Sequence, residues 1–200
     1  MVRRGLLGGT FDPPHIGHLT IAEEVRLKFS LDEIVFIPAG QPWVKAAARV
    51  SPAWQRLEMI KLATAGKPYF SVNDMEVRRP GPSYTWQTLE ELKKVYPGDE
   101  LYFILGWDNL TSLPSWHHPE LIVKDAWLLA VPRLGTPRPD LDALDLRVPG
   151  LAAKTAIMTE PQIDVSATVI RAMVKLGEPV NRLVTEPVAE YMRLNELYRE

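Results

Sequence analysis

The order of the first three expected elements constrains the fold more than any other feature of the chain. Residues 2–7 form a short apolar run, and apolar residues then recur at helical spacing from Ile16 to Phe29. The run Ile-Val-Phe-Ile-Pro at 34–38 is rich in β-formers and continuously apolar, which is typical of a strand buried on both faces. A strand, a helix and a strand within this length predict a right-handed crossover between two parallel strands.

The rest of the chain continues the same alternation. A proline- and aspartate-rich segment at 132–150 alternates little and is expected to be an exposed excursion, and 108–122 is expected to mix helix and loop. We expect further strands at 69–73, 100–105, 126–131 and 155–158, and further helices at 52–65, 85–95, 166–176 and 187–195. In the last helix, Val188, Tyr191, Met192 and Leu194 are the expected packing residues. The pattern predicts an α/β protein with a doubly wound, mainly parallel sheet in a single domain over residues 1–200.

Composition excludes several classes of function. Apolar residues make up 46% of the 200 residues and charged residues 24%, which is typical of a globular protein. The net charge of −2 gives no overall field that attracts nucleic acid or an anionic membrane. There is no cysteine, so disulfides and thiol chemistry are excluded. No apolar run approaches the roughly 20 residues of a membrane span and the amino terminus lacks a signal-peptide core, so we expect a cytoplasmic protein.

The stretch 8–18, Gly-Gly-Thr-Phe-Asp-Pro-Pro-His-Ile-Gly-His, joins the first strand to the first helix. Such a turn lies at the carboxyl end of its strand, where ligands bind in parallel sheets. Gly8 and Gly9 have no Cβ, so a ligand can lie against the backbone. The i, i+3 spacing puts His15 and His18 on one face of the first helical turn, where unpaired amides and the helix dipole favour an anion. We interpret this as a phosphate site; the alternative is that one histidine caps the helix and the other packs.

The usual nucleotide signatures are missing. No Gly-x-Gly-x-x-Gly follows the first strand, and Gly66-Lys67 lacks the upstream glycine and the following Ser or Thr of a P-loop. A second polar cluster lies at 165–171, Val-Ser-Ala-Thr-Val-Ile-Arg, which places hydroxyls and an arginine in the first turns of a helix. These groups can hold a polyphosphate. In isolation, an ordinary helix cap with a surface arginine explains them equally well.

Residues 9–18 resemble the signature of the His-x-Gly-His nucleotidyltransferase superfamily. These enzymes transfer a nucleotidyl group from a nucleoside triphosphate to a phosphate- or hydroxyl-bearing acceptor and release pyrophosphate. The segment 165–171 resembles the Ile-Ser-Ser-Thr-x-Ile-Arg segment of the same superfamily. Ser83-Tyr84-Thr85, Gly106-Trp107-Asp108, Trp116 and the ending at 187–191 look like the bacterial nicotinate-mononucleotide adenylyltransferases. The resemblance covers almost the whole chain, from residue 8 to residue 198.

This resemblance implies a Rossmann-like fold, ATP and nicotinate mononucleotide as substrates, and Mg²⁺ held mainly by the ATP phosphates with no protein metal site. It also implies that the helical part at about 164–200 completes the ATP site. The residues assigned to the transfer step are Thr10, His15, His18 and Arg171. Those assigned to ATP are Gly8, Gly9, Phe11, Gly17, Gly106, Asp108, Ser166 and Thr168, and those assigned to the acceptor are Lys45, Thr85, Trp116 and His117.

The chain departs from the family pattern at four positions. Val44 stands in place of a loop histidine before Lys45, Gln87 replaces a frequent aspartate, Trp107 replaces a small residue, and Ala167 replaces a serine. None of them lies in the 9–18 stretch.

Three other functions stay open. One is the same chemistry with nicotinamide mononucleotide or phosphopantetheine as the acceptor, and another is a nucleotide sensor without catalysis. The third is a metalloenzyme using the histidines at 15, 18, 117 and 118, whose spacing does not match a zinc-binding His-Glu-x-x-His motif.

Overall fold

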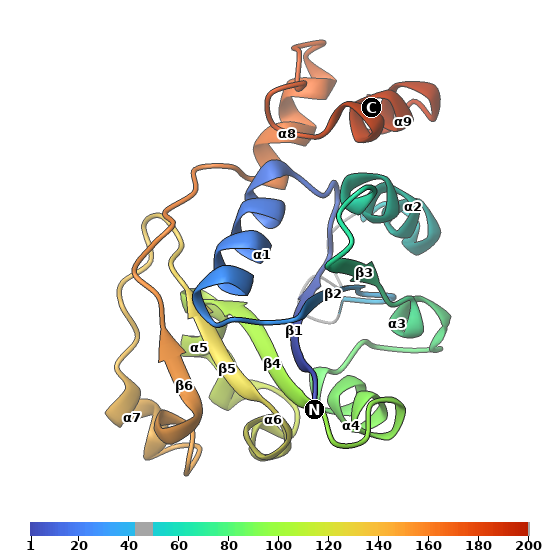
Figure 1. The fold of residues 1–200 in the computed structure, drawn as a ribbon. Helices are drawn as coiled ribbons and strands as arrows, with labels where there is room; N and C mark the ends of the chain where they lie inside the picture. Colours follow the sequence, from blue (N-terminus) through green and yellow to red (C-terminus); the bar gives the residue numbers. More distant parts are fainter. Residues whose placement is uncertain (43–49, 200) are drawn as a thin grey trace.

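A single sheet of six parallel strands forms the centre of the computed structural model, which describes residues 1–42 and 50–199 (Figure 1). The strand order is β3-β2-β1-β4-β5-β6, and every neighbouring pair is parallel. The strands are β1 (Arg3–Gly9), β2 (Glu33–Pro38), β3 (Phe70–Val72), β4 (Glu100–Gly106), β5 (Trp127–Val131) and β6 (Thr155–Ile157). This is the doubly wound order of the Rossmann fold, so the predicted fold class is confirmed.

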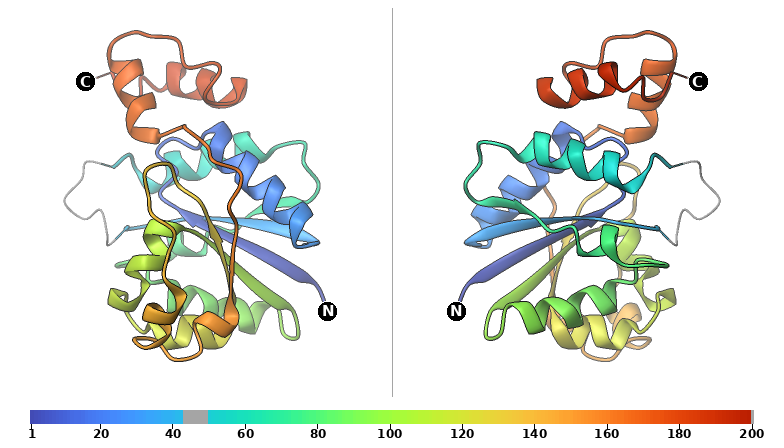
Figure 2. Two further views of the ribbon diagram at one scale, coloured as in Figure 1. Left: turned by 90° about the vertical axis from the view of Figure 1, so that its left-hand side faces the viewer. Right: turned by 90° about the vertical axis from the view of Figure 1, so that its right-hand side faces the viewer.

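Helices cover both faces of the sheet (Figures 1 and 2). The first face packs against Ala22 and Val25 of α1 (Ile16–Lys28) and against Leu57 and Ile60 of α2 (Ala53–Thr64). The opposite face packs against α4 (Thr85–Val95) and α6 (Pro119–Asp125). The remaining elements are α3 (Met75–Arg78), α5 (Trp107–Ser112), α7 (Leu141–Asp145), α8 (Ala167–Lys175), α9 (Glu186–Leu194) and two 3₁₀ turns, η2 (Leu113–Ser115) and η3 (Ala152–Lys154).

The last two helices, α8 and α9, lie beyond the sheet against α1 and α2 (Figure 2). They form a third apolar cluster in which Met59 and Ala63 of α2 pack against Ile170, Val188 and Met192. The backbone amide of Ile16, the first residue of α1, donates to the carbonyl of Leu183 at 2.9 Å. The carboxyl-terminal part is therefore attached to the start of α1, directly beside the 8–18 stretch.

The strand order places the residues that follow β1 and β4 at the ligand-binding edge of the sheet. In the sheet, β2 and β3 lie on one side of β1, whereas β4, β5 and β6 lie on its other side. Ligands bind at such a switch point, outside the carboxyl ends of the strands. β1 ends at Gly9, and β4 ends at Gly106 with α5 beginning at Trp107, so both predicted nucleotide segments lie there.

Most expected elements are confirmed with boundaries that differ by no more than two residues, but two expectations are wrong. The segment 132–150 is not simply exposed: it contains α7, capped by the Asp140 side chain, and buries Leu144 and Val148 in the core. Leu194, expected to pack, is 65% exposed because it lies at the end of α9. The short helix α3 was not expected. No helix in 1–42 or 50–199 is long and apolar enough to cross a membrane.

Candidate active site

The two histidine rings of the 8–18 stretch stack on each other at the start of α1. Their centroids are 3.6 Å apart and their planes differ by 25°. His15 is the residue that precedes the helix, and its backbone amide donates to Nδ1 of His18 at 3.1 Å. A neutral imidazole has one protonated nitrogen, so this bond assigns the His18 proton to Nε2. The i, i+3 spacing thus brings the rings together as expected, and His18 can donate through Nε2.

His15 is buried and electrically neutral at physiological pH. Burial lowers its pKa to about 4, and the positive charge of Arg133 contributes to the shift. Its Nδ1 atom is buried and has no hydrogen-bond partner among the described residues. A buried polar atom of this kind is costly unless a ligand or water completes it. Arg133, which follows β5 at the same edge of the sheet, was not among the residues assigned from the sequence.

Two glycines of the stretch are required by the packing around these rings. A Cβ on Gly17 would lie 3.0 Å from Nδ1 of His15 and 3.0 Å from Ile163. A Cβ on Gly9 would lie 3.0 to 3.2 Å from the ring of Phe11. That ring is buried and contacts the His18 ring edge-on, with centroids 4.9 Å apart. A Cβ on Gly8 would have only ordinary contact with Phe103, so the structure leaves space at that position.

The expectation of unpaired amides at the start of α1 is partly wrong. The Ile16 amide donates to Leu183, and the His18 amide donates to the carbonyl of His15 at 3.0 Å. The first bond is tertiary, because the carboxyl-terminal part covers this end of the helix, whereas the second is a local bond within the first turn. Any anion bound here therefore depends more on side chains than on free backbone donors.

The structure brings the distant cluster at 165–171 to the histidine loop. Ser166 caps α8, and its hydroxyl accepts from the amide of Thr168 at 3.2 Å. From the first turns of that helix, Arg171 donates to the backbone carbonyl of Asp12 at 2.7 Å and to the Thr168 hydroxyl at 3.4 Å. The Arg171 guanidinium is therefore hydrogen-bonded to a residue that lies three positions before His15 in the sequence. Ala167 is the first residue of α8.

The first turn of α5, which follows β4 directly, presents a carboxylate to the same edge. Asp108 accepts from Arg133 at 2.6 Å. A Cβ on Gly106 would force the Asp108 carboxylate to move from its present position. Trp107 points the other way and packs in the core with the helices on the opposite face. Its difference from the family pattern is thus accommodated in the core.

Two of the expected acceptor residues lie near each other. Thr85 is the first residue of α4, and the preceding Tyr84 contacts His117 with ring centroids 4.2 Å apart. Trp116 is partly buried against the edge of Phe103, and its Nε1 donates to the hydroxyl of Ser112 at 3.2 Å. Lys45 and Val44 lie outside the described residues, and Gln87 is a partly buried residue of α4 whose replacement the structure does not explain.

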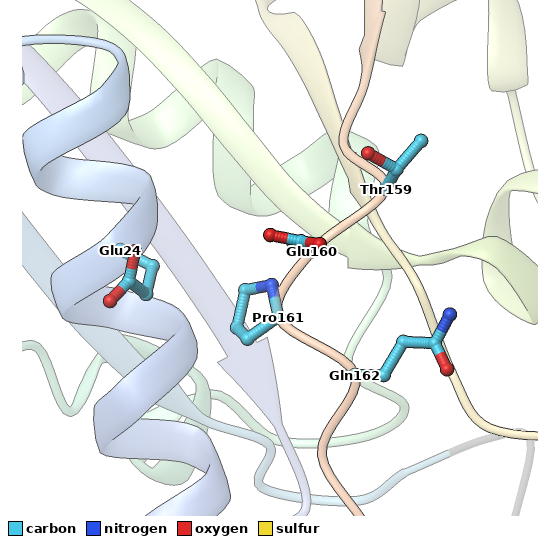
Figure 3. A pocket seen from close by; sticks show the side chains of 5 residues that line it. All are labelled: Glu24, Thr159, Glu160, Pro161 and Gln162. Atoms are coloured by element: carbon cyan, nitrogen blue, oxygen red, sulfur yellow. The ribbon is translucent and has the colours of Figure 1, made fainter.

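A pocket of about 370 Å³ lies to one side of this site (Figure 3). It is lined by Glu24 of α1 and by residues 159–162, which lead from β6 toward α8. Two of the lining side chains, Glu24 and Glu160, are carboxylates, and a triphosphate would be repelled by them. This pocket is therefore unsuited to a triphosphate.

Comparison with known proteins shows the family to which the chain belongs. The cytidylyltransferase-like family model matches residues 6–173. A Dehalococcoides mccartyi protein named "Probable nicotinate-nucleotide adenylyltransferase" is 50% identical over 198 residues, covering 98% of this chain and 97% of its own. A Thermomicrobium roseum protein of the same name is 39% identical, covering 100% of this chain and 92% of its own. The chain belongs to the nicotinate-nucleotide adenylyltransferase family.

The fold is shared with solved members of this adenylyltransferase family. A Plasmodium falciparum nicotinic acid mononucleotide adenylyltransferase complexed with NaAD has a TM-score of 0.79 at 18% identity, covering 99% of this chain and 98% of that one. A putative nicotinate-nucleotide adenylyltransferase from Vibrio parahaemolyticus has a TM-score of 0.72 at 19% identity, covering 100% and 97%. At these identities, the likeness establishes the fold.

Proposed function

We propose that this adenylyltransferase transfers the adenylyl group of ATP to nicotinate mononucleotide, giving nicotinate adenine dinucleotide and pyrophosphate in NAD biosynthesis. The observation that carries the proposal is the hydrogen bond from Arg171 to Asp12, which joins a distant cation to the loop of the stacked histidines. The acceptor is inferred from the relatives, which carry the name of this activity over nearly their full length. The cytoplasmic location expected from the sequence stays a prediction.

The transfer needs no nucleophile from the protein. An oxygen of the acceptor 5′-phosphate attacks the α-phosphorus of ATP and forms the new P–O bond. The bond from the α-phosphorus to the oxygen that bridges to the β-phosphorus breaks, and pyrophosphate leaves with that electron pair. The attacking phosphate is already ionised near neutral pH, since the second pKa of a phosphate monoester is about 6. The work of the protein is then positioning and charge stabilisation.

The stacked histidines and Arg171 bind different phosphates of the triphosphate. The Nε2–H of His18 donates to the α-phosphate, where negative charge develops, and the neutral ring of His15 donates to a neighbouring oxygen. The Thr10 hydroxyl donates to the same phosphate. Arg171 holds the β- and γ-phosphates with Ser166 and Thr168, so the part at about 164–200 completes the ATP site in a single domain of residues 1–200.

The two substrates meet at the switch point of the sheet. The ATP ribose binds Asp108, whose carboxylate is then shared with Arg133. Trp116 and Thr85 hold the pyridine ring of the acceptor by stacking and hydrogen bonding. The remaining ATP contacts are assigned to Gly8, Gly9, Phe11, Gly17 and Gly106, and the remaining acceptor contacts to Lys45 and His117.

The residues near the site fit a Mg²⁺ ion held mainly by ATP oxygens. Both carboxylate oxygens of Asp12 are engaged, one by Tyr198 and one by the amide of Ser51, and Asp108 is paired with Arg133. No group of three or more potential metal-binding side chains occurs in the part of the chain that the structure describes. Bound to the phosphates, Mg²⁺ would supply charge neutralisation.

Pyrophosphate release from ATP tests the proposal. Nicotinate mononucleotide, nicotinamide mononucleotide and phosphopantetheine are compared side by side at equal concentrations. We expect the highest kcat/KM with nicotinate mononucleotide. Higher values with either other acceptor would replace the substrate assignment, and no release with any of them would favour a nucleotide sensor.

A further inference from the structure

Asp12 connects the histidine loop to three segments that are distant in sequence. The residue is 5% exposed and lies three positions before His15. One carboxylate oxygen accepts from the hydroxyl of Tyr198 at 2.6 Å, and the other accepts from the amide of Ser51 at 3.2 Å. Its backbone carbonyl accepts from Arg171 at 2.7 Å. The position of this one residue therefore affects both the loop and the distant arginine.

The carboxyl-terminal tail that supplies Tyr198 has a defined conformation. The side chain of Leu197 is buried in the cluster formed by α2, α8 and α9, and its amide donates to the carbonyl of Met192 at 3.0 Å. Glu196 and Tyr198 have φ angles of 51° and 63°, in the left-handed region. Residues other than glycine stay in that region only where surrounding contacts hold them. The tail is thus anchored before it reaches Asp12.

A buried arginine holds the other end of the same loop. Arg56 of α2 is 1% exposed and donates to the carbonyl of Thr10 at 2.7 Å. It also donates to the carbonyls of Ser51 at 2.9 Å and Gly40 at 3.1 Å.

Burial raises the pKa of Tyr198, and the charge of Asp12 adds to the shift, so the hydroxyl keeps its proton and donates. The loop between Thr10 and His15 is held from both sides.

We propose that Tyr198 is a positioning residue for the transfer reaction, acting through Asp12. The hydroxyl fixes the Asp12 carboxylate, and Asp12 fixes both the backbone that carries His15 and His18 and the guanidinium of Arg171. The phosphate-binding groups then meet the triphosphate in one arrangement. This inference rests on the proposed function, and it makes the last residues of the chain a part of the ATP site.

The test is Tyr198→Phe, which keeps the ring and removes only the donor. We expect kcat to fall by about 10- to 100-fold, because a misplacement of about 1 Å can cost about 10² in rate. The KM for the acceptor should change less than twofold, and the melting temperature should fall by only a few degrees: Leu197 stays buried, but one oxygen of the buried Asp12 carboxylate loses its donor. A chain that ends at Leu197 should show the same loss of kcat.

A double-mutant cycle separates positioning from general stability. If Tyr198 acts through Asp12, Tyr198→Phe should cause little further loss of kcat in an Asp12→Ala background, whereas independent effects would multiply. Tyr191→Phe, in the neighbouring helix α9, is the matched control and should leave kcat unchanged.

An unchanged kcat for Tyr198→Phe, or losses that multiply, would overturn this inference while wild-type turnover upholds the proposed function. No pyrophosphate release by the wild-type protein would overturn both.

Discussion

The buried, neutral state of His15 predicts a specific dependence of stability on pH. Burial lowers the pKa of this ring from 6.5 to about 4 in the folded protein. In the unfolded chain the ring titrates near its ordinary value, so the unfolded state binds more protons between these two pH values. Stability is therefore complete above pH 6.5 and falls as the pH is lowered toward 4.

The magnitude follows from the shift. The whole difference corresponds to about 3 kcal/mol, at about 1.4 kcal/mol for each pKa unit. At pH 5 the linkage relation gives a loss of about 2 kcal/mol in the free energy of unfolding relative to pH 7.5. Glu76, whose pKa is raised by burial, acts with the opposite sign. A comparison with a variant isolates the His15 contribution.

Urea unfolding of the wild type and of His15→Asn at pH 7.5 and pH 5.0 measures this contribution. Asparagine keeps a good residue at the start of α1 but does not titrate. We expect the wild type to lose about 2 kcal/mol more than the variant between the two pH values. The same pH dependence in His15→Asn as in the wild type would refute the reasoning.

Three further predictions concern the reaction. His18→Ala should stay folded and lose about 10²–10³ in kcat, the usual cost of losing a preorganised donor; near-normal turnover would end the assignment. Trp116→Ala should raise the KM for the acceptor more than the KM for ATP. Trp116→Phe, which keeps an aromatic ring, should have an acceptor KM close to that of the wild type. Equal effects of Trp116→Ala on both substrates would exclude stacking. Gly17→Ala should lower kcat by up to about tenfold with a stable fold, because its Cβ would shift the His15 ring by a few tenths of an ångström; unchanged kinetics would show that the ring position is unimportant.

Much of the fold could be predicted because its signals are local. Continuous β-rich runs such as 34–38 identify buried parallel strands, and the glycine-rich turn before Ile16 marks the first crossover. The helix α7 was missed because its two buried residues, Leu144 and Val148, stand within a segment rich in proline and aspartate. Local composition outweighed a weak spacing signal there.

In the candidate site too, features set by the local sequence were predictable, whereas features set by tertiary packing were not. The i, i+3 spacing predicted that His15 and His18 lie on one face, but the stacking of their rings also depends on the extended backbone of His15 before the helix and was not predicted. The bond that pairs the Ile16 amide with Leu183 depends on tertiary packing, so the sequence could not reveal it. Arg133 and Tyr198 were missed for the same reason: neither forms part of a local motif, and their positions matter only once the sheet order and the path of the tail are known.

The most direct test of the central claim is a structure of the protein with a hydrolysis-resistant ATP analogue and Mg²⁺. The account predicts that the triphosphate lies at the start of α1, with Nε2 of His18 about 3 Å from an α-phosphate oxygen and Arg171 on the β- or γ-phosphate. A triphosphate bound elsewhere, or bound with neither histidine within hydrogen-bond distance, would contradict it.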